Sequence, residues 1–132
     1  MPARQGTWNG AHWIRREKRL AIYLRDQFRC VYCNRNLAKV KAKLRVLDHV
    51  IPVTKGGTNH ESNLATCCSR CNNQKGDRVG GEFLFVKYRT DLDKFIKFND
   101  RLNQLLKTPI NRELGKRLLD GTLDLTDVLT KE

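Results

Sequence analysis

Two Cys-x-x-Cys pairs constrain this chain more than any other feature of its sequence. Cys30 and Cys33 form the first pair, and Cys68 and Cys71 form the second. A two-residue spacer allows both sulfurs of a pair to reach one tetrahedral ion, and four cysteines complete a closed shell around zinc. We therefore predict a structural zinc site that joins two distant segments. Disulfide or redox use of the same cysteines is the alternative, which two pairs on a short basic chain disfavour.

A fifth cysteine, Cys67, stands directly before the second pair. It competes with Cys68 as a ligand, but the spacing from Cys67 to Cys71 is one residue too long for a Cys-x-x-Cys pair. We expect Cys67 to be a small, buried thiol outside the metal shell.

Polar residues of a different kind lie between and after the two pairs. Asp48 and His49 are adjacent and precede a Pro-x-x-x-Gly-Gly loop, and Asn72 directly follows the last cysteine. With a carboxylate and an imidazole side by side, one group can bind a cation while the other faces a water molecule. A single histidine is usually an ordinary polar residue, but the position of His49 between the two pairs favours a functional role.

The whole series of motifs resembles one known family. C-x-x-C, D-H-x-x-P, G-G, N-L and C-x-x-C-N-x-x-K follow one another within residues 15–78, and this order is similar to that of the zinc-stapled HNH endonucleases found among phage nucleases and McrA-like restriction enzymes. The resemblance implies an α+β fold with a ββα-metal core, in which a hairpin, a loop and a helix surround one catalytic divalent cation. It also implies hydrolysis of DNA phosphodiester bonds, by nicking or double-strand cleavage, leaving a 5′-phosphate and a 3′-hydroxyl.

The resemblance implies a role for each motif residue. His49 is expected to be the general base, and Asp48 and Asn72 are expected to hold the catalytic cation, either Mg²⁺ or Mn²⁺. Asn63 is expected to brace the loop between the strands. His60 lies in the same loop but does not occupy a motif position.

The positive charge of the chain is concentrated in the part that carries the motifs. The net charge is +12, and residues 1–80 contain 16 Lys and Arg against 5 Asp and Glu, whereas residues 81–132 contain 10 against 9. Such segregation is typical of a protein that binds nucleic acid. The resemblance implies a phosphate contact for Lys75, and the other candidate contacts to phosphate groups are Lys55, Arg70 and Arg78.

We expect three parts along the chain. Residues 1–13 form an arm, in which Trp8 and Trp13 either pack on the domain or stack on bases. Residues 14–80 form the nuclease domain, and residues 81–132 form a helical appendage after a Gly-Gly boundary. The appendage either packs on the nuclease core or offers a docking surface for a dimer or a partner.

Local patterns predict the elements of the nuclease domain. Apolar residues at helical spacing predict a helix over residues 14–28. A short strand is expected over residues 44–47, running into Asp48 and His49. Residues 50–53 are expected to continue toward the second strand of the hairpin, with Pro52 limiting their pairing. A second helix is expected to begin near Glu61 or Ser62, to carry Cys68, Cys71 and Asn72, and to end at Gly76.

The remaining expectations concern location and partners. No apolar run approaches the ~20 residues that a membrane helix needs, and the first ten residues do not resemble a signal peptide. Cysteines used for zinc fit a reducing compartment, so we expect the cytoplasm of a bacterium or of a phage-infected host. DNA is the expected partner, with a homodimer or a packaging or restriction protein left open. The alternative functions are a zinc-stabilised nucleic-acid-binding module without catalysis and a nuclease subunit that is active only with a partner.

Overall fold

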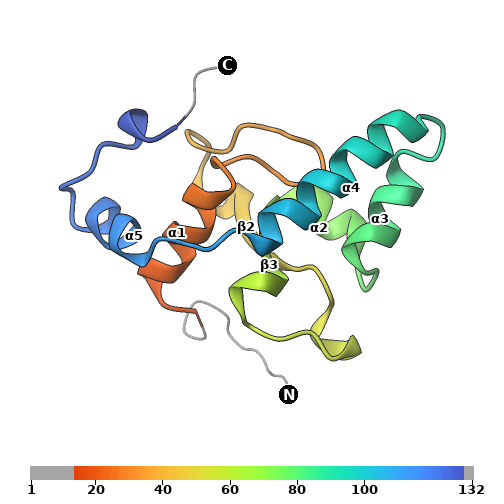
Figure 1. Cartoon of the computed structure of the whole chain (residues 1–132), viewed down its shortest axis with the longest axis horizontal. Helices are drawn as coiled ribbons and strands as arrows, with labels where there is room; N and C mark the ends of the chain where they lie inside the picture. Colours follow the sequence, from red (N-terminus) through yellow and green to blue (C-terminus); the bar gives the residue numbers. More distant parts are fainter. Residues whose placement is uncertain (1–13, 130–132) are drawn as a thin grey trace.

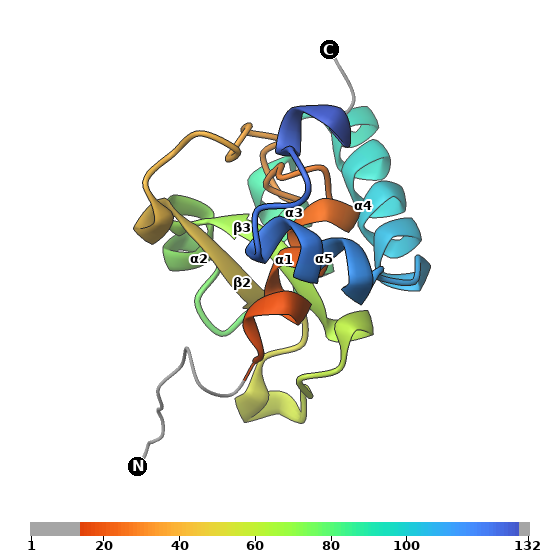
Figure 2. The same ribbon diagram turned by 90° about the vertical axis from the view of Figure 1, so that its left-hand side faces the viewer.

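A two-stranded antiparallel hairpin forms the centre of the molecule. The computed structural model describes residues 14–129, so the expected arm over residues 1–13, with Trp8 and Trp13, lies outside the described residues. Helices α1 (Arg16–Arg25) and α5 (Arg112–Leu119) lie on one side of the hairpin, and helices α3 (Gly80–Lys87) and α4 (Leu92–Lys107) lie on the other (Figures 1 and 2). The expected mixed fold of helices and a small antiparallel sheet is confirmed.

The two strands of the hairpin are β2 (Arg45–His49) and β3 (Leu64–Cys68), which pair antiparallel with Asp48 opposite Ala65 and His49 opposite Leu64. The first strand was expected. Residues 50–53, which were expected to continue toward the second strand, do not pair with β2, and the second strand begins only at Leu64. The carbonyl of Pro52 instead accepts hydrogen bonds from the amides of Lys55 and Gly57, which closes a turn. Proline also has no amide hydrogen to donate to a strand ladder.

The prediction of a helix from residue 61 onward is also wrong. A short 3-10 turn over Glu61–Asn63 leads into β3, and helix α2 (Ser69–Lys75) begins only after Cys68. Every residue of β3 is buried, and an apolar run without alternation does not distinguish a strand from a buried helix. Pairing with β2 decides the outcome. The expected end of the helix at Gly76 is confirmed by its left-handed φ of 56°.

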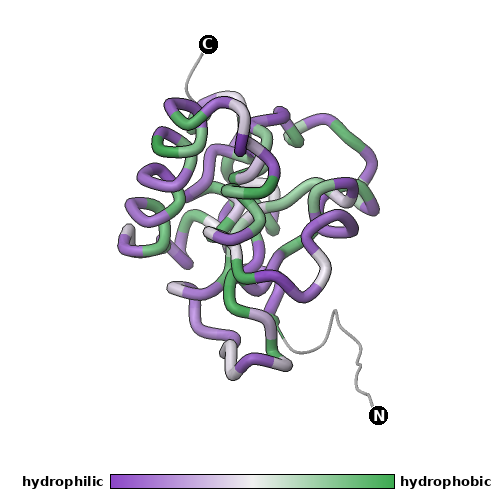
Figure 3. The backbone as a smooth tube through the Cα atoms, turned by 90° about the vertical axis from the view of Figure 1, so that its right-hand side faces the viewer, coloured by the Kyte–Doolittle hydropathy of each residue, from purple (hydrophilic) through white to green (hydrophobic). Residues whose placement is uncertain are grey.

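Buried side chains form two hydrophobic clusters, and the strand residues contribute alternately to each. Ala65 and Cys67 belong to the cluster that contains the cysteine pairs and the buried residues of α3 and α4, whereas Leu47 and Leu64 belong to the cluster under α1 and α5. Figure 3 shows hydrophobic stretches of the backbone running through the middle of the molecule. Because successive residues of a strand face opposite sides, the register directs Asp48 toward the cysteine side.

Residues after position 80 contribute directly to the cluster around the cysteines. Phe83 and Leu84 of α3 and Phe98 and Leu102 of α4 are buried there. Gly80, at which the sequence suggested a domain boundary, is buried in the first turn of α3, and its amide donates to the carbonyl of Val50 at 2.8 Å. The division of the chain into three parts remains a prediction.

The first helix is shorter than expected. α1 ends at Arg25, because Gln27 and Phe28 adopt left-handed φ values of 58° and 54°. Phe28 nevertheless packs against Tyr23, with ring centroids 5.4 Å apart. α5 crosses α1 closely at Gly115, where a Cβ atom would lie 2.2 Å from the carbonyl oxygen of Glu17. Among the described residues, none of the helices is both long enough and apolar enough to cross a membrane.

Candidate active site and metal centre

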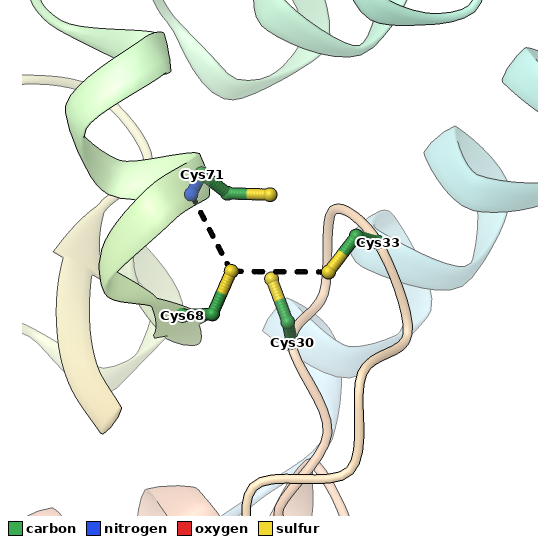
Figure 4. A group of neighbouring side chains, drawn as sticks. All are labelled: Cys30, Cys33, Cys68 and Cys71. Atoms are coloured by element: carbon green, nitrogen blue, oxygen red, sulfur yellow. Dashed lines mark hydrogen bonds between the residues drawn. The ribbon is translucent and has the colours of Figure 1, made fainter. Parts of the chain in front are cut away.

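Four cysteine side chains converge from two segments of the chain (Figure 4). Cys30 and Cys33 come from the loop after α1, Cys68 ends β3, and Cys71 lies on α2. All four sulfurs lie within 4.8 Å of one another, and Sγ of Cys33 is 3.8 Å from Sγ of Cys68. Tetrahedral zinc with bonds of about 2.3 Å separates its sulfurs by about 3.8 Å. The cluster can therefore hold a zinc ion in the expected four-cysteine shell.

The backbone around the cysteines is shaped to present their sulfurs. Asn34 adopts a left-handed φ of 67°, which asparagine tolerates better than most residues, and its amide donates to the carbonyl of Cys30 at 2.8 Å. At the second pair, the amide of Cys71 donates to Sγ of Cys68 at 3.4 Å. Hydrogen bonds from neighbouring thiols lower the pKa of Cys30, and the hydrogen bond from Cys33 has the largest effect. A lowered thiol pKa favours the thiolate, which is the form that binds metals.

Cys67 is buried beside the cluster but does not belong to the group of four sulfurs. Its thiol donates to the carbonyl oxygen of Cys68 at 3.2 Å. The pKa of Cys67 is raised, chiefly by a hydrogen bond to Cys30 and secondly by burial, so the protonated thiol is favoured. These surroundings suit a neutral thiol that lies next to the four clustered sulfurs.

A second cluster of polar side chains lines an open pocket of about 290 Å³. Asp48 and His49 come from the end of β2, and Asn72 comes from the first half of α2. The pocket is also lined by Leu47, Pro52, Val53, Thr54, Lys75, Gly76 and Asp77. The fold therefore brings together Asp48, His49 and Asn72, three of the four motif residues to which the resemblance gives a role, from segments more than twenty positions apart in the sequence.

The carboxylate of Asp48 is held from two sides. The hydroxyl of Tyr32 donates to Oδ2 at 2.6 Å, and the ammonium of Lys75 lies 3.3 Å from Oδ1. Asp48 is buried, and desolvation raises its pKa, while the hydrogen bond from Tyr32 and the charge of Lys75 oppose that shift. An ionised carboxylate has about four lone-pair sites, so these two partners leave acceptor capacity for a cation.

Lys75 was expected to contact a phosphate group, but its side chain is only 1% exposed. Besides Asp48, its ammonium donates to the carbonyl oxygen of His49 at 3.0 Å. The ammonium is thus committed to two protein partners beneath the pocket. By contrast, Lys55, Arg70 and Arg78 are exposed, so their charged groups are accessible to a phosphate.

The imidazole of His49 is half-buried, and Nε2 lies 2.8 Å from Oδ1 of Asn59. An amide oxygen only accepts hydrogen bonds, so Nε2 carries the proton in neutral His49 and Nδ1 is the basic nitrogen. Asn59 is itself anchored to α1, because Lys18 donates to its carbonyl oxygen at 2.8 Å. The arrangement suits a proton acceptor that opens onto the pocket.

Asn63 lies apart from this pocket and binds the backbone of the loop. Its side-chain oxygen accepts from the amide of Ile51 at 2.8 Å, and its nitrogen donates to the carbonyls of Ile51 and Thr58 at 3.0 and 2.9 Å. These bonds cross-link the two halves of the loop. His60 is exposed and bonds to Ser62 at 2.8 Å, so it takes part in the local turn.

Sequence reasoning missed two residues with direct contacts to the motif side chains. Tyr32 lies in the spacer of the first cysteine pair and contacts Asp48, and Asn59 lies in the loop and contacts His49. A tyrosine inside a predicted zinc knuckle was a visible signal, since a buried hydroxyl needs a partner. Its partner could not be identified without the fold.

Comparisons with known proteins yield one match. Residues 30–85 match the model of the HNH endonuclease family, which spans both cysteine pairs, the hairpin, α2 and most of α3. Neither curated proteins nor solved structures give a match to the chain.

Proposed function

Since residues 30–85 carry the match to the HNH endonuclease family, we propose that this protein is a metal-dependent endonuclease that hydrolyses phosphodiester bonds in DNA. The observation that carries the proposal is the shared pocket of Asp48, His49 and Asn72. A carboxylate and an amide oxygen can hold a divalent cation, and an imidazole can take a proton from a water molecule, so the pocket contains groups suited to single-metal hydrolysis of a phosphodiester. The four-cysteine zinc site has a separate, structural role.

His49 is the proposed general base. With the Nε2 proton donated to Asn59 Oδ1 at 2.8 Å, the imidazole has a defined tautomer and a restrained ring orientation. Nδ1 can then accept a proton from a water molecule in the pocket, as the water attacks the phosphorus atom. A neutral imidazole suits this role near pH 7.

Asp48 and Asn72 are the proposed ligands of the catalytic cation. Carboxylate and amide oxygens are hard donors, and Mg²⁺ is commonly held by one or two protein ligands with water completing its shell. When bound, Mg²⁺ or Mn²⁺ supplies polarisation of the scissile phosphate and neutralises charge on the leaving oxygen. The nearby Lys75 ammonium opposes the rise in the pKa of Asp48 that burial causes.

Lys55, Arg70 and Arg78 are the proposed contacts to the DNA backbone. All three are exposed, and Lys55 lies one residue beyond the lip of the pocket at Thr54. Their charges, within the basic part of the chain, attract the phosphates of a duplex without reading its sequence. Binding through these residues should therefore weaken steeply as salt increases.

The test is cleavage of supercoiled plasmid by the wild type, His49→Ala and His60→Ala, each with Mg²⁺, Mn²⁺ or EDTA. His60→Ala is the matched control. His60 is exposed in the loop that joins β2 to β3, and it does not line the pocket. We expect metal-dependent cleavage by the wild type and by His60→Ala. His49→Ala should not cleave, yet it should retain its zinc and its affinity for DNA.

Other outcomes separate the remaining functions. A zinc-loaded wild type that binds DNA but cuts with neither cation would replace the nuclease with a binding module or with a subunit that needs a partner. Loss of folding in His49→Ala would mean that His49 is structural. Direct conversion to linear DNA, without a nicked intermediate, would indicate that two copies act together, because one active site cuts one strand.

A further inference from the structure

Tyr32 connects the cysteine cluster to the pocket through a single side chain. It lies in the two-residue spacer of the first cysteine pair, between Cys30 and Cys33, and its side chain is completely buried. The hydroxyl donates to Oδ2 of Asp48 at 2.6 Å. A hydrogen bond of this length to an ionised acceptor is among the strong ones in proteins.

The ring of Tyr32 is fixed by contacts on several sides. Phe83 packs edge-on against it, with ring centroids 5.2 Å apart, and the hydroxyl of Tyr88 donates to the carbonyl of Tyr32 at 2.5 Å. Gly80 leaves room for the tip of the ring, since a Cβ atom there would lie 2.8 Å from the Tyr32 hydroxyl. The flanking cysteines hold the backbone, so the hydroxyl has little freedom to leave Asp48.

The second partner of Asp48 is also tied to the cysteine cluster. Lys75 lies on α2, the helix that carries Cys71 and Asn72. The two segments that supply the metal-binding sulfurs therefore also supply the two groups that hold the Asp48 carboxylate. A carboxylate restrained at both oxygens presents its remaining lone pairs in a fixed direction, which favours cation binding.

We propose that Tyr32 is a positioning residue that orients Asp48 for the catalytic divalent cation and so links the four-cysteine site to the cation site. The inference rests on the proposed function and deepens it. Outer-shell partners of metal ligands change metal affinity by about 10- to 100-fold. Loss of the Tyr32 hydroxyl should thus weaken cation binding by about tenfold while leaving the four sulfurs in place.

The test measures Mn²⁺ binding to the zinc-loaded protein by electron paramagnetic resonance, for the wild type, Tyr32→Phe and Tyr23→Phe. Tyr23→Phe is the matched control: it removes a buried tyrosine hydroxyl from the cluster under α1, where that hydroxyl contacts Arg19 and Arg45. We expect a dissociation constant for Mn²⁺ about tenfold higher in Tyr32→Phe only. Zinc content should equal that of the wild type, and cleavage by Tyr32→Phe should recover as Mn²⁺ is raised.

A wild-type dissociation constant in zinc-loaded, folded Tyr32→Phe would overturn the inference while leaving the nuclease proposal intact. A wild type that neither binds Mn²⁺ nor cleaves would overturn both. If Tyr32→Phe does not fold, Gly80→Ala provides a second test, because it crowds the Tyr32 hydroxyl without removing it. Weakened Mn²⁺ binding in folded Gly80→Ala would support the inference, and unchanged binding would refute it.

Discussion

Oδ1 of Asn59 lies 2.8 Å from Nε2 of His49, and this contact favours the imidazole tautomer in which Nε2 carries the proton. The amide oxygen accepts the Nε2 proton, so the basic lone pair lies on Nδ1. Lys18 of α1 donates to the carbonyl of Asn59, which ties the orientation of His49 to a helix outside the hairpin.

Substitution of Asn59 should therefore impair catalysis more than folding. In Asn59→Ala, His49 loses its fixed tautomer and orientation, and with them part of the roughly 10²- to 10⁴-fold acceleration that a positioned base provides. We expect a fall of about tenfold or more in the single-turnover rate of plasmid nicking, with little change in DNA affinity. Asn103→Ala, at an exposed position on α4, is the control. An unchanged rate in Asn59→Ala would mean that His49 is oriented by other contacts.

Two adjacent cysteines should respond oppositely to replacement by serine. Cys68→Ser removes one of the four converging sulfurs, and because metal binding and folding are coupled in small zinc domains, we expect loss of zinc and melting of the core. Cys67→Ser should keep one zinc per chain, as its thiol lies outside the group of four. Zinc content by mass spectrometry under native conditions distinguishes them. Retained zinc in Cys68→Ser together with loss in Cys67→Ser would reverse the assignment.

The buried ion pair of Lys75 and Asp48 should be important for stability. Their side chains are 1% and 6% exposed, so Lys75→Met leaves a carboxylate in the interior without its ammonium partner. Breaking a buried pair in this way costs about 3–5 kcal/mol. We expect a loss of that size in the free energy of unfolding by urea, measured with zinc present.

Lys55→Met is the matched control for that measurement. Lys55 is exposed, so its substitution should leave stability nearly unchanged and should instead reduce the salt dependence of DNA binding. If Lys75→Met were stable and showed the weaker salt dependence, Lys75 would act as a phosphate contact, as the sequence resemblance implied.

Adjacent glycines in the loop should differ sharply in their tolerance of alanine. A Cβ atom at Gly57 would lie 1.6 Å from the carbonyl oxygen of Ile51 and 2.8 Å from Nδ2 of Asn63. The loop cannot keep its shape around such an overlap, so we expect Gly57→Ala to lose at least about 3 kcal/mol of unfolding free energy and most cleavage activity. Thermal melting and plasmid nicking provide the two readouts.

Gly56→Ala is the natural comparison. Gly56 has a φ of 91° but nothing within 4 Å of its Cβ position, so only backbone strain of about 1–2 kcal/mol is expected. Equal effects of the two substitutions would contradict the steric explanation for Gly57.

The parts of the site that were predictable from sequence depend on short-range spacing. The two cysteine pairs indicated the four-sulfur cluster, because each pair is a local unit that presents two sulfurs to one ion. The end of a helix at Gly76 was recognisable, since glycine readily adopts the positive φ that ends a helix. Asp48 and His49 were also recognisable from the sequence, because they are adjacent residues at the end of an expected strand.

The second half of the hairpin required the tertiary structure. Leu64–Cys68 is buried throughout, so the sequence offers neither alternation nor helical periodicity to identify it, and only pairing with Arg45–His49 makes it a strand. The turn at Pro52 follows from the same pairing, because the loop must span the distance between the paired ends.

By itself, the sequence determined which four cysteines converge, the basic character of the first 80 residues and the identity of the motif residues. The tertiary structure decided what those residues touch: Tyr32 and Lys75 on Asp48, and Asn59 on His49. The physical reason is that the spacing of neighbours along a chain fixes local geometry, whereas contacts between distant segments depend on how the whole core packs. For that reason the burial of Lys75 and its contact with Asp48 were not predictable from the sequence, and its phosphate contact remains a prediction.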